Sequence, residues 1–331
     1  MVSISPVHGG LVFADEKEET KKSDEVDPNA DYNPTTCTLP FEERLALVKA
    51  VGEEILTEPG LIELLKTKQQ FTCYDGFEPS GRMHIAQGIL RKINVNRITR
   101  AGGIFVFWVA DWFAMLNHKM GGDLAKIRVL GKYFIEIWRA CGMDLHNVKF
   151  LWASEEINKN AATYWPQVLD IATQNTLARI TKCCQIMGRK EKDTLSASQI
   201  FYPCMQCSDI FHLKADMCQL GQDQRKVNML ALEYCDTVGK SPKPVIVSHH
   251  MVLGLQQDPD SDEPVKMAKT NPEAAIFMED DPKDVESKIK KAYCPPKIVK
   301  LNPILEYAKY LIFPSFDELV IERKPEHGGN S

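Results

Sequence analysis

Short, continuous apolar runs alternate along the chain with stretches of helical periodicity. The clearest run, residues 104–111, reads Ile-Phe-Val-Phe-Trp-Val-Ala-Asp and is typical of a strand buried on both faces. Similar patterns predict strands at residues 71–77, 148–152, 215–220 and 244–247, and helices at 84–100, 123–141 and from residue 223 onward. This alternation predicts an α/β fold with a Rossmann-like, doubly wound parallel sheet.

The pattern also divides the chain. Residues 1–37 are rich in Asp, Glu, Lys, Ser and Pro, which predicts a disordered acidic N-terminal tail. The main domain is expected over residues 38–280, where a helix starts near Pro40 and a helical insertion without a strand signal occupies about 155–200. Residues 281–331 are Lys-rich and mainly helical, with expected helices at 285–292 and 304–313.

Composition narrows the class of protein. With 331 residues, 44% of them apolar and 26% charged, the chain is long enough for a large soluble core. Ten cysteines in a chain this size predict reduced thiols and a cytosolic setting rather than a disulfide scaffold. No stretch predicts a signal peptide, a transit peptide or a membrane span. The formal charge of −5 argues against indiscriminate nucleic-acid binding, but a local basic face is compatible with it.

The stretch from Tyr74 to Gln87 predicts a buried strand, a tight turn and a helix that begins at a histidine. Pro79 and Gly81 suit the turn, and His84 falls at the start of the helix. Backbone amides at such a helix start attract phosphate groups. A histidine in this position also fits a structural cap without a catalytic task.

A second polar motif, Lys266-Met-Ala-Lys269-Thr270, lies in a stretch without apolar periodicity. Two lysines in a loop suit a polyphosphate clamp, although a solvated charged loop has the same composition. The order and separation of the two motifs resemble the HIGH and KMSKS signatures of class I aminoacyl-tRNA synthetases, with the second loop over 256–272. The resemblance gives His84, Gln87, Lys266 and Lys269 catalytic roles around the ATP phosphates.

The chain departs from the two signatures at two positions, and such departures affect the expected rate of activation. Gln87 stands at the second histidine position of the first motif, and Ala268 replaces a serine of the second. The loss of one charge-assisted hydrogen bond, of roughly 1.5 to 3 kcal/mol, would slow activation tenfold or more.

Between the motifs, Tyr202-Pro-Cys-Met-Gln206-Cys-Ser-Asp209 is followed by Gly221-Gln-Asp223-Gln224. Here most of residues 38–331 closely resemble the tyrosyl-tRNA synthetase family of the eukaryotic and archaeal branch. The resemblance implies that Tyr74 and Asp209 bind the substrate phenol, while Tyr202, Gln206 and Gln224 hold its amino and carboxylate end. It also implies nucleotide contacts from a set of loop residues: Gly76, Pro79, Gly81, Gly221, Asp223 and Thr270.

The resemblance further implies a tyrosine-tRNA ligase that uses ATP with Mg²⁺ as a substrate complex and has no tightly bound cofactor and no resident metal. Its expected partners are tRNA(Tyr), L-tyrosine and a second copy of the chain, in the cytoplasm. Residues 281–331 would then form part of a helical anticodon-binding domain. Basic residues at 182, 189, 190 and 192, and six lysines between 283 and 300, are candidates for RNA phosphate contacts.

Several alternatives remain at this stage. Asp223 also fits a plain helix N-cap, and Cys204-x-x-Cys207 with Cys183 and Cys184 superficially suggests zinc, although apolar packing is favoured. A tryptophanyl-tRNA synthetase shares the fold and both signatures, but the Tyr74 and Asp209 pair favours a phenol. A catalytically weakened paralogue that binds RNA or protein is the alternative from another class. A nicotinamide-dependent dehydrogenase is disfavoured because no Gly-x-Gly-x-x-Gly follows the first strand.

Overall fold

The computed structural model describes residues 26–189, 193–258, 263–267, 271–316, 318–323, 325–327 and 329. Its centre is a six-stranded sheet with the strand order β1-β6-β5-β2-β3-β4. The strands are β1 Gly52–Ile55, β2 Phe71–Phe77, β3 Gly103–Val109, β4 Val148–Trp152, β5 Met217–Gly221 and β6 Val245–His249. All neighbouring pairs are parallel except β1 with β6. The predicted Rossmann-like α/β class is therefore confirmed, with an antiparallel edge strand added.

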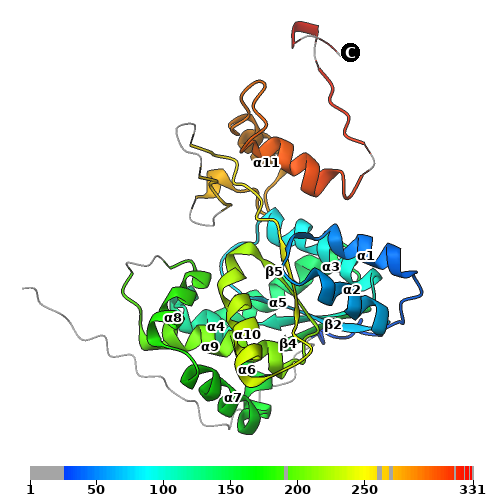
Figure 1. Ribbon diagram of the computed structural model, residues 1–331. Coiled ribbons are helices and arrows are strands. Elements are labelled where there is room, and N and C mark those ends of the chain that lie inside the picture. The colour runs from blue at the N-terminus through cyan, green and yellow to red at the C-terminus, as the bar shows by residue number, and fades with distance from the viewer. Residues whose placement is uncertain are drawn as a thin grey trace, which may run out of the picture.

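Helices cover both faces of the sheet (Figure 1). One face packs against α1 Phe41–Lys49, α2 Glu58–Thr67, α3 Arg91–Arg100 and α5 Leu124–Ala140. The other packs against α4 Asp111–Leu116, α6 Ala153–Lys159, α7 Ala161–Thr173, α8 Leu177–Cys183, α9 Ala197–His212 and α10 Arg225–Val238. Alternate residues of each strand enter opposite cores, as the period of two requires: Cys73 faces the first core and Tyr74 the second.

The predicted strand and helix positions agree with the structure to within a few residues, but three elements were not predicted. These are strand β1 and helices α2 and α4, and β1 begins at Gly52, three residues after α1 ends at Lys49. The region between β4 and β5 is helical, as expected, although α9 extends the helices to His212. Helix α3 is preceded by a π-helical turn at Ala86–Leu90, which begins two residues after His84.

Residues 26–37 differ from the expected disordered tail. The segment formed by residues 26–40, here called the N-terminal strap, runs beside the edge strand β4. The side chain of Asn29 donates to the carbonyl of Phe150 at 3.0 Å and accepts from its N–H at 2.7 Å. These two bonds imitate a strand partner and cover the exposed sheet edge, which explains why a polar segment is ordered here. Residues 1–25 lie outside the described part of the chain.

The segment after β6 forms a third hydrophobic cluster, which includes Ile85 from the first motif and Met267 from the second. It leads into α11 Pro282–Lys290, α12 Pro303–Tyr307 and a π-helical turn at Ala308–Ile312, near the helices predicted at 285–292 and 304–313. In Figure 1 α11 stands apart from the sheet, at the top of the view. Within the described residues, no helix combines the length and apolar character needed to cross a membrane.

Candidate active site

The order of the strands in the sheet indicates where a binding site lies. The chain runs from β2 outward to β3 and β4 on one side, and β5 and β6 lie on the other side of β2. Tyr74 of β2 is in register with Cys218 of β5, so the loops that follow these two strands leave the sheet side by side. A crevice at the carboxyl ends of strands that diverge in this way is where doubly wound folds bind their ligands.

The phenol end of the candidate pocket is buried and polar. Tyr74 is 1% exposed and Asp209 of α9 is 0% exposed. Burial, together with the nearby Asp209, raises the pKa of the Tyr74 hydroxyl, which therefore stays protonated. Burial also raises the pKa of Asp209 well above its usual range, although a hydrogen bond from Tyr164 opposes this. The Tyr164 hydroxyl donates to Asp209 Oδ1 at 2.7 Å, whereas Asp209 Oδ2 has no hydrogen-bond partner among the described residues.

An unpartnered buried carboxylate oxygen is costly, and a ligand that supplies a hydroxyl donor removes the cost. The floor beneath this position is Gly76, where a Cβ would lie 3.2 Å from the Tyr74 hydroxyl oxygen. A larger residue at position 76 would therefore crowd the phenol of Tyr74.

The other end of the pocket contains the predicted tyrosine, glutamine and glutamine set. Tyr202 of α9 donates its hydroxyl to Glu78 Oε1 at 2.7 Å. Gln206 donates to the side-chain oxygen of Gln224 at 3.0 Å, and Gln224 in turn donates to the Ile186 carbonyl at 3.1 Å. These bonds fix the amides, so that their free polar atoms have defined directions. The structure thus joins Gln206 and Gln224 directly, whereas the Tyr202 hydroxyl is held by Glu78.

The turn that precedes His84 has the expected form. Gly81 has φ = 57°, a left-handed conformation that favours glycine, and Pro79 is buried beside it. The carbonyl of His84 accepts the N–H groups of Gln87 and Gly88, which starts the helix. Gln87 keeps its side-chain oxygen buried without a hydrogen-bond partner among the described residues.

The predicted nucleotide loop after β5 is tight. A Cβ on Gly221 would lie 2.5 Å from Asp223 Oδ1 and 2.9 Å from Met251 Sδ, so a larger residue would displace these two side chains. The alternative that Asp223 is an N-cap is wrong, because α10 begins at Arg225 and Gln224 is its N-cap residue. Asp223 lies in a 3₁₀ turn and is exposed, and its Oδ2 accepts from Gln224 at 3.1 Å. Its carboxylate is therefore available to a ligand.

The second motif is described only in part. Lys266 forms an antiparallel bridge with Leu253, and Met267 packs in the cluster that contains Ile85. The two motifs therefore meet around one small core. Lys269 and Thr270, as well as Ala268, lie outside the described residues, as do Lys190 and Lys192 of the insertion.

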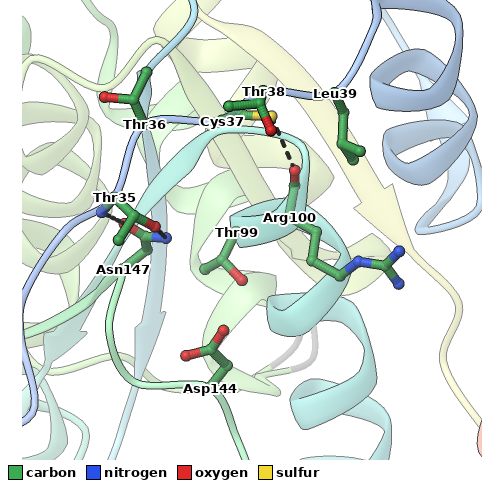
Figure 2. Close-up of a pocket in the computed structure, with 9 residues that line it drawn as sticks. All are labelled: Thr35, Thr36, Cys37, Thr38, Leu39, Thr99, Arg100, Asp144 and Asn147. Atoms are coloured by element: carbon green, nitrogen blue, oxygen red, sulfur yellow. Dashed lines mark hydrogen bonds between the residues drawn. The ribbon is translucent and has the colours of Figure 1, made fainter.

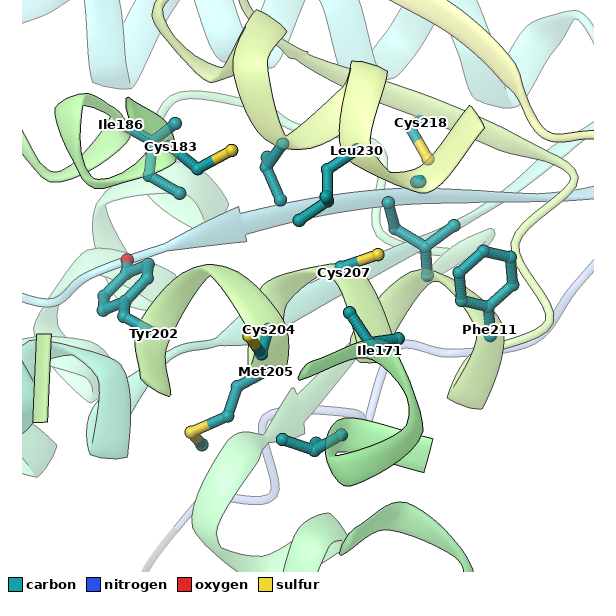
Figure 3. Close-up of a cluster of buried hydrophobic side chains, with 14 of the residues drawn as sticks. Ile171, Cys183, Ile186, Tyr202, Cys204, Met205, Cys207, Phe211, Cys218 and Leu230 are labelled. Atoms are coloured by element: carbon teal, nitrogen blue, oxygen red, sulfur yellow. The ribbon is translucent and has the colours of Figure 1, made fainter. Parts of the chain in front are cut away.

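The cysteine motif belongs to the core. Cys183, Cys184, Cys204 and Cys207 are all buried in the cluster beneath α10. Figure 3 shows the side chains of Cys183, Cys204, Cys207 and Cys218 spread among apolar neighbours rather than directed at one point. Over the described ranges, no group of three or more His, Cys, Asp or Glu side chains has an arrangement that could hold a metal ion. Apolar packing accounts for these thiols.

Sequence reasoning missed several polar residues of the site. Tyr164 comes from α7, 45 residues before Asp209, and no motif in the sequence connects the two residues. Glu78 accepts from Tyr202 and from Asn117, and burial raises its pKa while Lys119, Tyr202 and Asn117 lower it. Glu78 directly follows β2, and an acidic residue at that position was a signal that could have been used.

A second buried polar group lies on the opposite face of β2. Arg91 Nη2 is 3.2 Å from Asp75 Oδ2, and burial raises the pKa of Asp75 to about 6, although Arg91 lowers it. At the end of β6, burial, Arg91 and His250 lower the pKa of His249 to about 3, so this imidazole is neutral. Its Nδ1 lies 2.5 Å from Gln219 Nε2. These groups support the loops around Gly221 rather than the phenol pocket.

A cavity of about 280 Å³ lies elsewhere, between the N-terminal strap and the end of α3 (Figure 2). Residues 35–39 form one wall, with Thr99, Arg100, Asp144 and Asn147 opposite. It contains none of the predicted site residues, and the hydrogen bonds across it join the strap to the body. The cavity therefore reflects the packing of the strap.

Comparison with known proteins agrees with this geometry. The family model of class I tRNA synthetases (W and Y) matches residues 66–330. A cytoplasmic tyrosine--tRNA ligase 1 of Arabidopsis thaliana is 61% identical over 87% of this chain, which spans 74% of that protein. The tyrosyl-tRNA synthetase of Leishmania major in complex with tyrosinol is 54% identical, with a TM-score of 0.78 over 83% of this chain, which spans 42% of that longer one.

The tyrosyl-tRNA synthetase of Pyrococcus horikoshii in complex with L-tyrosine is 32% identical, with a TM-score of 0.80 over 88% of this chain and 85% of its own. The similarity thus extends across the sheet, the helical insertion and the segment after β6. The chain belongs to the tyrosyl-tRNA synthetase family of class I.

Proposed function

We propose that this chain activates L-tyrosine with ATP to form tyrosyl-adenylate and pyrophosphate, and then transfers tyrosine to tRNA(Tyr). The observation that supports this most directly is the buried Asp209, whose Oδ2 has no partner among the described residues while Tyr164 holds Oδ1. A substrate phenol hydroxyl placed between Asp209 and Tyr74 would donate a hydrogen bond to the Asp209 carboxylate and accept one from the Tyr74 hydroxyl. Phenylalanine would leave both groups unpaired.

The opposite end of the pocket suits an α-amino acid. Glu78 adds a negative charge beside the Tyr202 hydroxyl, and a substrate ammonium group would gain from both. The Gln206 and Gln224 amides would complete the recognition of the amino and carboxylate groups. Because these side chains are held by hydrogen bonds before substrate arrives, little order has to be created on binding.

ATP would enter as its Mg²⁺ complex, as a substrate rather than a resident group. We infer that the ribose lies against Gly221 and Asp223, with the phosphates over the turn at Pro79 and Gly81. His84 would stabilise the charge that develops on the α-phosphate during in-line attack by the tyrosine carboxylate, and Gln87 would add a neutral donor. Lys266 and Lys269, with Thr270, would hold the β- and γ-phosphates.

We infer further that the protein works as a cytoplasmic homodimer that pairs through the helical insertion. Helices α7, α8 and α9 each expose one large apolar side chain, namely Leu169, Leu177 and Phe201. Such side chains are common on monomers singly, but three on one insertion suit a contact with a second copy. The segment after residue 280 would contribute to tRNA binding.

A tryptophanyl specificity is disfavoured because an indole N–H could donate to Asp209 but could not accept a hydrogen bond from the Tyr74 hydroxyl, as a phenol oxygen can. A weakened paralogue that only binds RNA or protein is disfavoured because it would have no need for a complete polar amino-acid pocket. The test is amino-acid-dependent exchange of pyrophosphate into ATP, which requires adenylate formation but no tRNA. The proposal predicts exchange with tyrosine and none with tryptophan; a folded protein that gives no exchange with any amino acid would support the paralogue.

A further inference from the structure

The segment that follows the lysine loop is bound directly to the histidine motif. The N–H of Ile85 donates to the carbonyl of Ile276, and the N–H of Met278 donates to that of Met83, both at 2.9 Å. His84 and Phe277 face each other across this short antiparallel ribbon. A ribbon with so few backbone bonds is marginal by itself, so side chains have to hold it.

Those side chains are Arg82, Asp280 and Lys288, which surround Phe277 and are called here the Phe277 cluster. The Arg82 guanidinium lies 4.2 Å from the centre of the Phe277 ring and the Lys288 ammonium 5.0 Å from it. Both cations also contact Asp280: Arg82 Nη2 donates to Oδ1 at 2.8 Å and Lys288 Nζ donates to Oδ2 at 2.5 Å. Two cations therefore lie within cation–π distance of one ring, and one carboxylate binds both of them.

Asp280 is the hub of the cluster. Its side chain is 3% exposed, and its Oδ2 also accepts the backbone N–H of Phe277 at 2.8 Å. One carboxylate thus fixes the histidine motif through Arg82, the ribbon through Phe277 and helix α11 through Lys288. Removing one partner from a buried ion cluster is strongly destabilising locally, because the remaining charges lose their compensation.

Lys288 corrects an expectation from the sequence. It was grouped with the lysines suited to RNA phosphates, but it is 7% exposed and also donates to the Ala275 carbonyl at 2.9 Å. A lysine that is buried and bonded to Asp280 and Ala275 is withdrawn from an external ligand. Its position ties α11 to the residues just after the lysine loop.

We propose that Asp280 is a positioning residue for adenylate formation, which sets the lysine-loop side of the site relative to His84. The catalytic part of this inference rests on the proposed function. Phosphoryl chemistry of this kind depends on placement, and a displacement of about 1 Å can cost roughly 100-fold in rate. The phenol pocket is built on α7, α9 and β2 and shares no contact with the Phe277 cluster in the described residues. Asp280 therefore acts on the ATP side of the reaction alone.

The test compares Asp280→Asn with Glu279→Gln. The Asn variant keeps the size of the side chain but removes the charge that binds both cations. Glu279 is a matched control because it is adjacent and also lies near Arg82, at 3.4 Å from its Nε, but is more exposed. In pyrophosphate exchange, Asp280→Asn is expected to lower kcat about tenfold or more while the KM for tyrosine stays within twofold, and Glu279→Gln is expected to change kcat by less than twofold. An unchanged kcat, or a matching rise in the KM for tyrosine, would overturn the proposal.

Two further measurements keep the outcome decisive. Arg82→Gln removes one partner of Asp280 by a change at a half-exposed position, whereas Asp280→Asn changes a buried side chain. Arg82→Gln is expected to lower kcat severalfold. Amide hydrogen exchange of the folded protein measures the stability of the ribbon and does not depend on catalytic activity. Asp280→Asn should raise the exchange rates of the Ile85 and Met278 amides about tenfold relative to Glu279→Gln. If the wild type shows no pyrophosphate exchange, the proposed function fails, whereas equal protection of the two amides in both variants refutes the positioning role.

Discussion

At the scale of single residues, buried tyrosines differ in what their hydroxyls do. Tyr164 and Tyr234 are both buried and each donates to an aspartate, Tyr164 to Asp209 and Tyr234 to Asp170. Of these two aspartates, Asp209 has a buried oxygen, Oδ2, without a hydrogen-bond partner among the described residues. We infer that Tyr164 orients the carboxylate that reads the substrate, whereas Tyr234 serves only the fold.

The substitution Tyr164→Phe is therefore expected to lower the preference for tyrosine over phenylalanine about three- to tenfold, because Asp209 loses the bond that fixes its direction. The preference is measured as the ratio of kcat/KM values in pyrophosphate exchange. Tyr234→Phe is the control and should change this ratio by less than twofold. Equal effects of both substitutions would mean that Tyr164 acts through stability alone.

Asp75 gives a prediction about pH. Its folded-state pKa of about 6 lies above the ordinary value of 3.8, so ionised Asp75 opposes folding at neutral pH and the penalty disappears as the pH falls from about 6 to 4. Asp75→Asn is expected to raise the free energy of unfolding by about 3 kcal/mol at pH 8 and by less than about 1 kcal/mol at pH 4.

Denaturant unfolding at the two pH values checks this, with the exposed Glu63→Gln as the control. A gain for Asp75→Asn that is the same at both pH values would show that Asp75 is not buried as an ionised group at neutral pH. A loss at pH 8 would show that its pairing with Arg91 outweighs its burial.

At the scale of elements, the sequence predicted those that carry long periodic patterns and missed those whose pattern is too short. Strands β2 to β6 and helices α3, α5, α10 and α11 follow from apolar runs or helical spacing, whereas most of α9 lies beyond the helical insertion predicted at about 155–200. Strand β1, with four residues, sits at the sheet edge and has only one side chain type that signals a strand, Ile55. Its pairing with β6 is a tertiary contact that no local pattern encodes.

The candidate site follows the same division. Residues inside recognisable motifs were predicted, whereas Tyr164 and Glu78 enter the pocket through contacts between elements far apart in the chain. The strap is a further case: its polar composition predicted disorder, yet Asn29 finds two backbone partners on β4.

The strap gives a prediction of its own. Asn29→Ala is expected to lower the free energy of unfolding by about 1 to 3 kcal/mol, because it leaves the N–H and carbonyl of Phe150 without their partner. Asn33→Ala is the control, since the contact of Asn33 with His146 is made by its backbone. Chemical denaturation compares the two, and equal values for both variants would mean that the strap does not stabilise the sheet edge.

At the scale of the whole molecule, the proposed dimer is the least local feature. Leu177 on α8 is 68% exposed and Phe201 on α9 is 48% exposed. If the insertion pairs two copies, Leu177→Asp with Phe201→Asp should shift the protein toward the mass of one chain in sedimentation velocity. Val129→Asp, at a 65% exposed position on α5, should leave the distribution unchanged. A wild type that sediments as a single chain at micromolar concentration would contradict the proposed dimer.

We propose that the buried pocket beside Tyr74, at the carboxyl ends of the central strands β2 and β5, selects tyrosine through Asp209. The most direct test is the ratio of kcat/KM for tyrosine and phenylalanine in pyrophosphate exchange, for the wild type and for Asp209→Asn. We predict a wild-type ratio of roughly 10⁴ or more and a fall of about 10- to 100-fold in the variant. An unchanged ratio in a folded Asp209→Asn protein would contradict the assignment of Asp209 to the substrate phenol.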